Sequence, residues 1–242
     1  MTKKVCIKTT NEHITIVQDT LDILLKKMLL DPIQGNSSAI LLDIEPAYVA
    51  YYATDQRCND IGDMNLSDIM KLFCHWAYSC KHDNIYKTYA YKCKMCFQLS
   101  MAFHNMSGEH QNIPGFIEAI KSRVQKHDLS KLEDPELSTF MEYTDKLKTV
   151  TYGSQEYIQF LEEMQPALKH HYQNNRHHPE HHKNGIAGMN LIDLIEMFCD
   201  WYAATKRHDD GDIHKSIEHN KKRFGMSDQL ASIFTNTVSI LD

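Results

Sequence analysis

The chain has 242 residues, 42% of them hydrophobic and 24% charged, a composition that excludes a disordered or fibrous protein. Its net charge of −6, with histidines neutral, and the lack of a long Lys/Arg run argue against a surface for duplex nucleic acid. No stretch approaches 18 consecutive apolar residues and no signal peptide is recognised, so we expect a cytoplasmic protein that does not contact the membrane.

Apolar residues recur at intervals of three and four, and only nine glycines and six prolines interrupt them. This pattern predicts an all-α fold. We expect helices over residues 13–30, 46–57, 64–82, 85–105, 115–127, 135–148, 154–174, 189–208, 213–224 and 227–240. The clearest start is Asp134-Pro135-Glu136, which offers an N-cap side chain, a proline at the first helical position and an acid in the first turn.

Seven cysteines are scattered along the chain, and this odd number argues against a disulfide framework. Cys93 and Cys96 form a CxxC pair, but no second pair accompanies them and the flanking pattern is helical. We therefore expect reduced thiols and a structural role for this pair.

The chain contains an internal repeat. Residues 64–76 read MNLSDIMKLFCHW and residues 189–201 read MNLIDLIEMFCDW. The likeness continues downstream, where Asn105 of the first copy corresponds to Asn236 of the second. Identity in register at Met, Asn, Asp, Phe, Cys and Trp predicts a duplicated helical unit.

A histidine-rich tract precedes the second copy of the repeated motif. Its six imidazoles lie within thirteen residues, at His170, His171, His177, His178, His181 and His182. Imidazole is a common ligand for Zn, Fe, Mn and Co, but such tracts also occur on solvated turns. The tract alone does not decide between these two interpretations.

The helix that follows the tract carries Asp193, Glu196 and Asp200 on one face, with apolar residues opposite. No lysine interrupts this acidic face, and like charges at this spacing repel one another unless a cation compensates them. The first copy has Lys71 and His75 where the second has Glu196 and Asp200. Since the first copy also lacks the histidines, the two losses together favour a shared metal site.

A third element is the segment His127-Asp128-Leu129-Ser130-Lys131. Adjacent His and Asp can ligate one cation, and a nearby lysine can bind an anionic oxygen. Ser130 and Glu133 also fit a capping box, which needs no function. We expect residues 1–107 to form a degenerate helical repeat without metal ligands, and residues 108–242 to form the metal-binding catalytic unit, packed as one globule.

The order His-Asp, His-His-Pro-Glu and a later helical aspartate resembles the HD-domain metal-dependent phosphohydrolase superfamily. Its members are all-helical, hold one or two divalent metals and hydrolyse phosphate esters. Residues 110–238 also resemble an uncharacterised, phage-associated helical family with HDxSK, NxHHPE and EMxxDW signatures. These signatures are found here at His127–Lys131, Asn175–Glu180 and Glu196–Trp201. A phage-encoded protein of this kind acts in the host cytoplasm.

The resemblance implies a site for one or two divalent ions, which could be Mn, Co, Fe, Mg or Zn. The ligands that it implies are His127, Asp128, His177, His178 and Asp193. The superfamily has another histidine upstream of the His-Asp pair, and the candidates are His104 and His110. Alternatively, His171 replaces that ligand.

Divalent ions in such a site lower the pKa of a bound water, which gives hydroxide near neutral pH for attack on phosphorus. The expected substrate-binding residues are Lys131, Asn175 and Arg176. The expected catalytic residues are Asp128, Glu180 and Glu196. The two glutamates, or Asp200, would orient ligands or move a proton.

The favoured substrate is a small-molecule nucleotide, and the specific expectation is a 5′-(deoxy)nucleotidase that releases phosphate from nucleoside monophosphates. Cyclic nucleotides and nucleoside triphosphates are alternative substrates for the same site. A non-catalytic alternative treats the histidines as structural and the paired units as a ligand-sequestering or partner-binding module. The sequence carries no signal for an oligomeric state.

Overall fold

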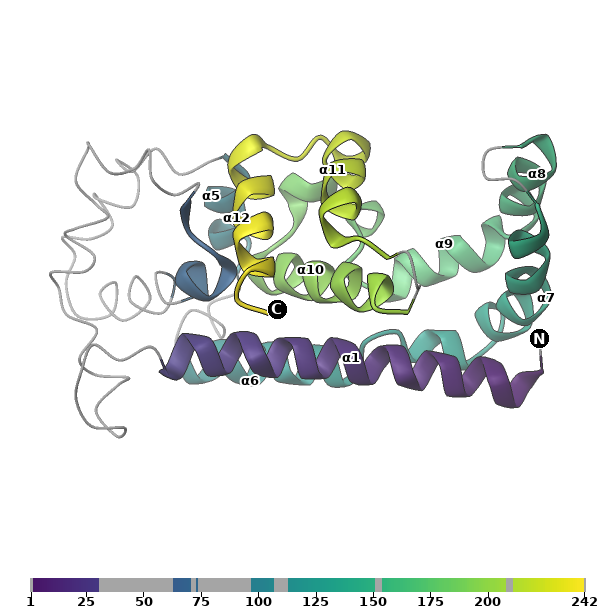
Figure 1. Cartoon of the computed structure of the whole chain (residues 1–242), viewed down its shortest axis with the longest axis horizontal. Coiled ribbons are helices and arrows are strands. Elements are labelled where there is room, and N and C mark those ends of the chain that lie inside the picture. The colour runs from purple at the N-terminus through teal and green to yellow at the C-terminus, as the bar shows by residue number, and fades with distance from the viewer. Residues whose placement is uncertain are drawn as a thin grey trace, which may run out of the picture.

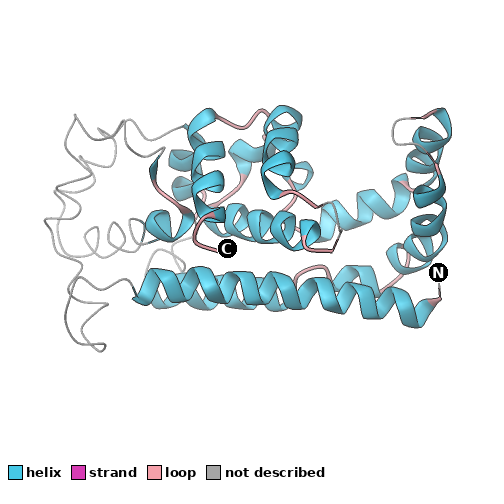
Figure 2. Cartoon of the chain, viewed as in Figure 1, coloured by secondary structure: helices cyan, strands magenta, loops and turns pink. Residues whose placement is uncertain are grey.

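The computed structural model of the chain describes residues 2–30, 63–70, 73, 97–106, 113–150, 154–207 and 211–241. Across these residues every regular element is helical and no strand is present, which confirms the predicted all-α fold (Figure 2). The predicted helix over 46–57, much of those over 64–82 and 85–105, and the Cys93–Cys96 pair lie outside the described residues.

The α-helices are α1 (Lys3–Leu30), α5 (Phe97–His104), α6 (Ile113–Gln125), α7 (Glu136–Thr149), α8 (Gln155–Glu163), α9 (Gln165–Asn174), α10 (Leu191–Thr205), α11 (Ile213–Phe224) and α12 (Asp228–Val238). Within the described segments, the 3-10 helices η3 (Leu129–Leu132), η4 (Pro179–His181) and η5 (Gly185–Gly188) join them.

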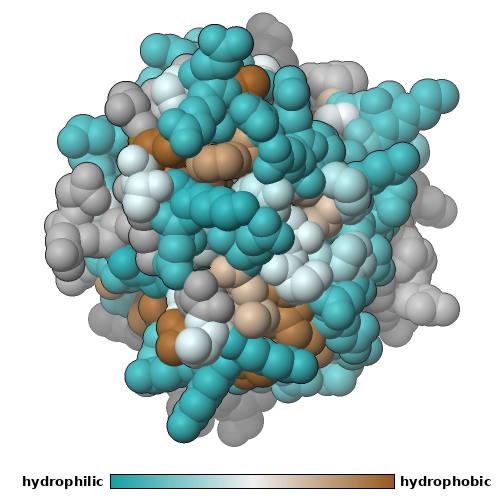
Figure 3. Space-filling view, turned by 90° about the vertical axis from the view of Figure 1, so that its right-hand side faces the viewer, coloured by the Kyte–Doolittle hydropathy of each residue, from teal (hydrophilic) through white to brown (hydrophobic). Residues whose placement is uncertain are grey.

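Helix α10 is the centre of the fold, because nearly all of its side chains are buried. Helix α1 packs along α10 and α6, while α11 and α5 also contact α10 (Figure 1). Helices α7, α8 and α9 form the end of the molecule near the N-terminus, where hydrophilic side chains dominate the surface (Figure 3). Among the described residues, no helix combines the length and apolar character needed to cross a lipid bilayer.

Two predicted helices have different bounds in the structure. Helix α1 begins ten residues earlier than predicted, at Lys3 rather than residue 13, because the buried positions Cys6 and Thr10 extend its inner face. The predicted single helix over 154–174 is wrong: α8 ends at Glu163 and α9 begins at Gln165. Pro166 in the first turn of α9 has no N–H to donate to a continuing helix.

The predicted start at Asp134 needs a smaller correction. Helix α7 begins at Glu136, and Pro135 rather than Asp134 is the N-cap residue. The carboxylate of Asp134 still accepts the backbone N–H of Ser138, at 3.1 Å. One of the first-turn amides that lack a helical partner is therefore satisfied by the predicted residue from one position further out.

Both copies of the repeat begin with the same capping box. Asn190 and Asp193 each accept the backbone N–H of the other, at 2.9 Å in both directions. In the first copy Asn65 and Asp68 do the same, at 3.1 and 3.2 Å. Such reciprocal bonds satisfy two backbone donors at a helix start, so the shared Asn-Leu-x-Asp sequence has a shared structural cause.

The two copies also exchange contacts. The side-chain amide of Asn105, late in the first copy, donates to the carbonyl of Met189 at the start of the second, at 3.2 Å. The amide of Asn236, late in the second copy, donates to the carbonyl of Met64 at the start of the first, at 3.1 Å. These corresponding contacts support the predicted duplication and hold the two units together.

Candidate metal centre

Asp128 lies at the centre of a buried cluster of imidazoles and carboxylates. Helix α6 ends at Gln125, and the chain turns so that Asp128 adopts the left-handed conformation, with φ of 55°. Aspartate is one of the few residues other than glycine that adopts this conformation readily. Its side chain is fully buried, and its two oxygens face different sets of ligands.

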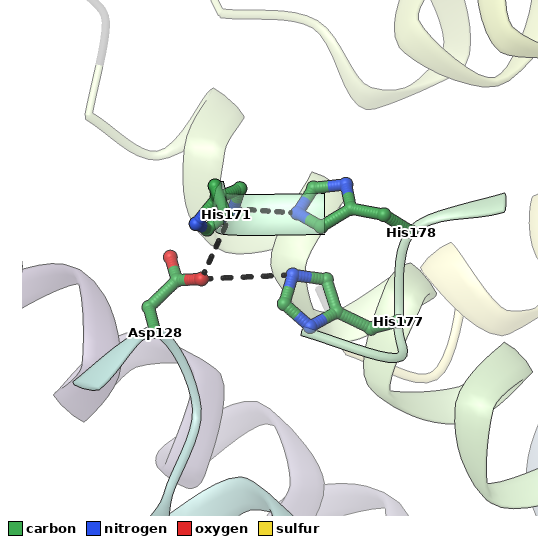
Figure 4. A group of neighbouring side chains, drawn as sticks. All are labelled: Asp128, His171, His177 and His178. Carbon is green, nitrogen blue, oxygen red and sulfur yellow. Dashed lines mark hydrogen bonds and ion pairs between the residues drawn. The ribbon is translucent and has the colours of Figure 1, made fainter. Parts of the chain in front are cut away.

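The first ligand group consists of Asp128, His171, His177 and His178 (Figure 4). The Oδ1 atom of Asp128 lies 3.6 Å from Nε2 of His171 and 3.7 Å from Nε2 of His177. The Nε2 atoms of His171 and His178 are 2.8 Å apart. These ligand atoms all lie within 4.8 Å of one another, so one ion could contact all four side chains.

The second ligand group consists of His13, His127, Asp128 and Asp200. The Oδ2 atom of Asp128 lies 3.5 Å from Nε2 of His127 and 3.8 Å from Nε2 of His13. Asp200 Oδ1 lies 2.8 Å from Nε2 of His13 and 3.5 Å from that of His127. Asp128 thus belongs to both groups and presents a different oxygen to each.

Two buried glutamates contact these histidines at Nδ1, the ring nitrogen opposite the one that faces the cluster. Glu136 contacts Nδ1 of His171 at 2.8 Å. Glu196 contacts Nδ1 of His127 at 3.0 Å and Nδ1 of His177 at 3.3 Å. A carboxylate on the far ring nitrogen is the usual support for a metal-binding histidine, because it fixes the tautomer and directs Nε2 at the ion. Glu196 therefore lies where it could orient both imidazoles, one of its two expected roles.

Several buried polar atoms that face the cluster lack a hydrogen-bond partner among the described residues. They include Nε2 of His127, Oδ1 of Asp128 and Nε2 of His177. An unpaired buried polar group costs about 1–3 kcal/mol, so three of them facing one space call for a ligand. Imidazole nitrogen and carboxylate oxygen together suit Zn, Mn, Fe or Co. The residues present therefore fit a divalent metal ion.

Burial and close charges shift the pKa values of the cluster. Burial alone would raise the pKa of Asp128, but His127 and Lys131 outweigh it and hold this pKa well below the usual range. Burial would lower the pKa of His127, yet the attraction of Asp128 and other carboxylates raises it to about 10. Burial, reinforced by His177, lowers the pKa of His178 to about 2, so this imidazole stays neutral. Binding of an ion at His127 would instead release the proton of that imidazole.

Asp193, which was expected to ligate a metal, lies outside both candidate ligand groups, whereas Asp200 belongs to the second. Asp193 occupies the first turn of α10, where it pairs with Arg123 at 2.7 Å and with Arg176 at 3.0 Å. Seven residues separate the two aspartates, about 10 Å along a helix. The carboxylate that reaches the cluster is therefore the one nearer the C-terminus of the acidic face.

This correction leads to a paired test. We expect Asp200→Asn to reduce the metal content of the purified protein, because it removes one of two carboxylates from the second ligand group. Asp193→Asn should leave the metal content unchanged and lower the free energy of unfolding by about 1–3 kcal/mol, because its arginine partners lose a buried anion. Elemental analysis and urea unfolding measure the two effects, and the opposite pattern would restore Asp193 as the ligand.

Of the other predicted site residues, Lys131 lies at the cluster, Asn175 lies beside it and Glu180 lies outside it. Lys131 reaches the cluster, with Nζ 2.5 Å from Oδ2 of Asp128. Asn175 is buried and donates to Ser130 and to the backbone of His171, so it supports a ligand turn. Glu180 pairs with Arg223 at 2.6 Å, outside both ligand groups.

The histidine tract is divided in the same way. His171, His177 and His178 enter the first ligand group, whereas His170 contacts Glu136 at 2.7 Å. His181 and His182 contact backbone carbonyl groups, each at 2.8 Å. Half of the tract therefore belongs to the candidate site, and the other half stabilises its surroundings.

His13 and Glu136 are the site residues that sequence reasoning missed. His13 comes from α1, within the segment expected to lack metal ligands, and no motif surrounds it. The sequence indicates Glu136 only as an acid in the first turn of a helix. Of the two candidates for an upstream histidine, His104 is exposed on α5 outside both groups, and His110 lies outside the described residues.

A protein-family model described as "Family of unknown function (DUF5662)" matches residues 101–240. No curated protein and no solved structure matches the chain. The matched region contains every residue of the two ligand groups except His13, which α1 brings to the site from outside it.

Proposed function

The chain belongs to the DUF5662 family, whose function is unknown, and we propose from its site that it is a divalent-metal-dependent phosphohydrolase acting on nucleotides. The specific proposal is a 5′-(deoxy)nucleotidase that releases phosphate from nucleoside monophosphates. The metal dependence rests on the geometry of the buried cluster. The nucleotide substrate rests on the resemblance of the His-Asp and His-His-Pro-Glu motifs to HD-domain phosphohydrolases.

One observation carries the proposal: the two oxygens of Asp128 face two different ligand groups. A carboxylate shared in this way is what two neighbouring cations need, and two-metal sites are common in phosphatases and nucleases. Divalent ions held there would stabilise charge on a phosphoryl group and lower the pKa of water. The proposed stoichiometry is therefore two ions per chain, one in each ligand group.

The protein's own groups would prepare the site for this chemistry. Glu136 and Glu196 keep the histidine Nε2 atoms directed at the cluster. Lys131 brings an ammonium group that can bind a phosphoryl oxygen. The side chains of Asp200 and Lys131 are 16% and 27% exposed, whereas that of Asp128 is fully buried. Substrate would therefore approach from the side of Asp200 and Lys131.

The experiment that tests the function combines metal analysis with a substrate panel. The full chain, purified in metal-free buffer, is analysed for bound metal and assayed for phosphate release from ribo- and deoxynucleoside monophosphates with Mn²⁺, Co²⁺, Mg²⁺ or Zn²⁺. We expect about two ions per chain and metal-dependent phosphate release. As a control, His219→Ala removes an exposed imidazole of α11 outside both ligand groups. It should bind metal and release phosphate like the unchanged protein.

The same panel separates the alternatives. Release of pyrophosphate or tripolyphosphate from nucleoside triphosphates, or ring opening of a cyclic nucleotide, would keep the metal site and change the substrate. Absence of both bound metal and turnover would reject the phosphohydrolase and favour a non-catalytic ligand- or partner-binding module.

A further inference from the structure

Lys131 is folded back onto the carboxylate of Asp128 by the short helix η3. The backbone N–H of Lys131 donates to the carbonyl of Asp128 at 2.9 Å, which closes a tight turn between them. Its Nζ donates to Oδ2 of Asp128 at 2.5 Å. A lysine three residues after the aspartate is thus held directly against a candidate metal ligand.

The oxygen that Lys131 contacts belongs to the second ligand group. Oδ2 of Asp128 is the atom that faces His13 and His127, at 3.8 and 3.5 Å. Asp200, the other carboxylate of this group, also acts on the ammonium: burial would lower the pKa of Lys131, but the attraction of Asp128 and Asp200 raises it. The ammonium therefore lies where both carboxylates of the second ligand group attract it.

Within the described part of the chain, no lysine or arginine pairs with Oδ1 of Asp128, the oxygen that faces the first ligand group. Oδ1 of Asp128 faces His171 and His177 (Figure 4), whereas Lys131 contacts the other oxygen, Oδ2. Among the described residues, Oδ1 accepts no hydrogen bond. An ion could therefore enter the first ligand group without displacing another positive charge.

An ammonium and a divalent ion would compete for Oδ2. If both bound it, a single and a double positive charge would lie about 4 Å apart and repel each other strongly in a site of low polarity. Lysine has a long, flexible side chain, so its ammonium can leave the carboxylate without a change in the backbone.

We propose that Lys131 competes with the second divalent ion for Asp128, so that the first ligand group fills first and the second fills only by displacing the ammonium. This inference rests on the proposed metal-dependent function and deepens it. The displaced ammonium stays at the partly exposed side of the site, where it becomes available to a phosphoryl oxygen. Substrate binding by Lys131 is thereby coupled to occupancy of the second position.

The test is a titration of the metal-free full chain with Mn²⁺, in which electron paramagnetic resonance measures the free ion and circular dichroism confirms helical content. The unchanged protein should bind one ion tightly and a second more weakly. Lys131→Met should tighten the second site about tenfold or more, because it removes the competing charge. Lys131→Arg retains that charge and should keep the second site weak.

Lys121→Met is the matched control, since it removes the same charge from an exposed position on α6. It should leave both dissociation constants unchanged. An unchanged second site in Lys131→Met, or equal tightening in Lys121→Met, would overturn the competition. Equal tightening in Lys131→Arg would also overturn it, because the charge would then be irrelevant.

A second measurement follows the ammonium itself. Reductive methylation detected by mass spectrometry should modify Lys131 slowly in the metal-free protein and several-fold faster once two equivalents of Mn²⁺ are bound. Lys121 should react at the same rate in both states. Equal rates for Lys131 in the two states would reject its displacement.

Failure of this inference and failure of the proposed function give different results. If both proteins bind two Mn²⁺ ions and the affinity of the second site is the same in Lys131→Met as in the unchanged protein, the competition is overturned and the metal-dependent function remains. No binding of Mn²⁺ or of Zn²⁺ by the folded chain would overturn both.

Discussion

Replacement of Asp128 by asparagine is expected to empty both metal positions and to reduce phosphate release by more than about 100-fold. Substitution of a residue that only hydrogen-bonds to a metal ligand already lowers metal affinity or activity by about 10–100-fold. The substitution removes the charge and one oxygen that face the two ligand groups. Asparagine tolerates the left-handed conformation of residue 128, with φ of 55°, so the turn after α6 should be retained. Elemental analysis and the phosphate assay measure the two losses.

Glu12→Gln is the matched control for this prediction. It makes the same carboxylate-to-amide change at an exposed site on α1, where Glu12 pairs with the exposed Lys8. Circular dichroism of both variants distinguishes loss of metal from loss of fold, because removal of a ligand can unfold a domain that depends on its metal. Two bound ions in folded Asp128→Asn would contradict the shared-ligand arrangement, whatever the effect on turnover.

The parts of the site that could be predicted lie within short segments. His127 and Asp128 are adjacent, and His177 and His178 are adjacent, so their proximity follows from the chain itself. The acidic face of α10 follows from helical periodicity. These patterns predict which residue types lie close together. The cluster around Asp128 contains residues from the His-Asp pair, from the His-His pair and from the acidic face of α10.

The choice between Asp193 and Asp200 could not be made in this way, because both lie on the same face of α10. It depends on where Arg123 of α6 lies in space, 70 positions earlier in the chain. Arg123 and Arg176 neutralise Asp193, which leaves Asp200 to the second ligand group. Helical periodicity identifies the face that carries both carboxylates, and packing decides which of them reaches the site.

The bounds of the helices, too, could be predicted from the sequence pattern only where packing partners did not decide them. The pattern predicted α11 correctly at residues 213–224, where capping by Asp212 and a left-handed Gly225 mark both ends. It failed at the start of α1, where the buried positions before residue 13 are the small Cys6 and the polar Thr10. A polar residue on an inner face is informative only once its partner is known, and for His13 that partner is Asp200.

His13→Ala should reduce the metal content from two ions to one. The second ligand group would keep a single imidazole, that of His127, beside its two carboxylates, whereas the first group has three imidazoles and loses none. Alanine is the best helix former, so α1 should remain intact. Mn²⁺ titration measures the stoichiometry, and phosphate release should fall because the second position no longer fills.

The control for His13→Ala is His219→Ala, which removes an imidazole exposed on α11 and should keep two ions. The result decides what α1 contributes, because this helix lies outside the region that matches the family model. Loss of one ion would make α1 part of the metal centre, so that residues 101–240 contain a complete first ligand group and an incomplete second one. Two ions in the His13→Ala protein would limit α1 to packing against α10 and α6, and the second ion would depend on His127, Asp128 and Asp200 alone.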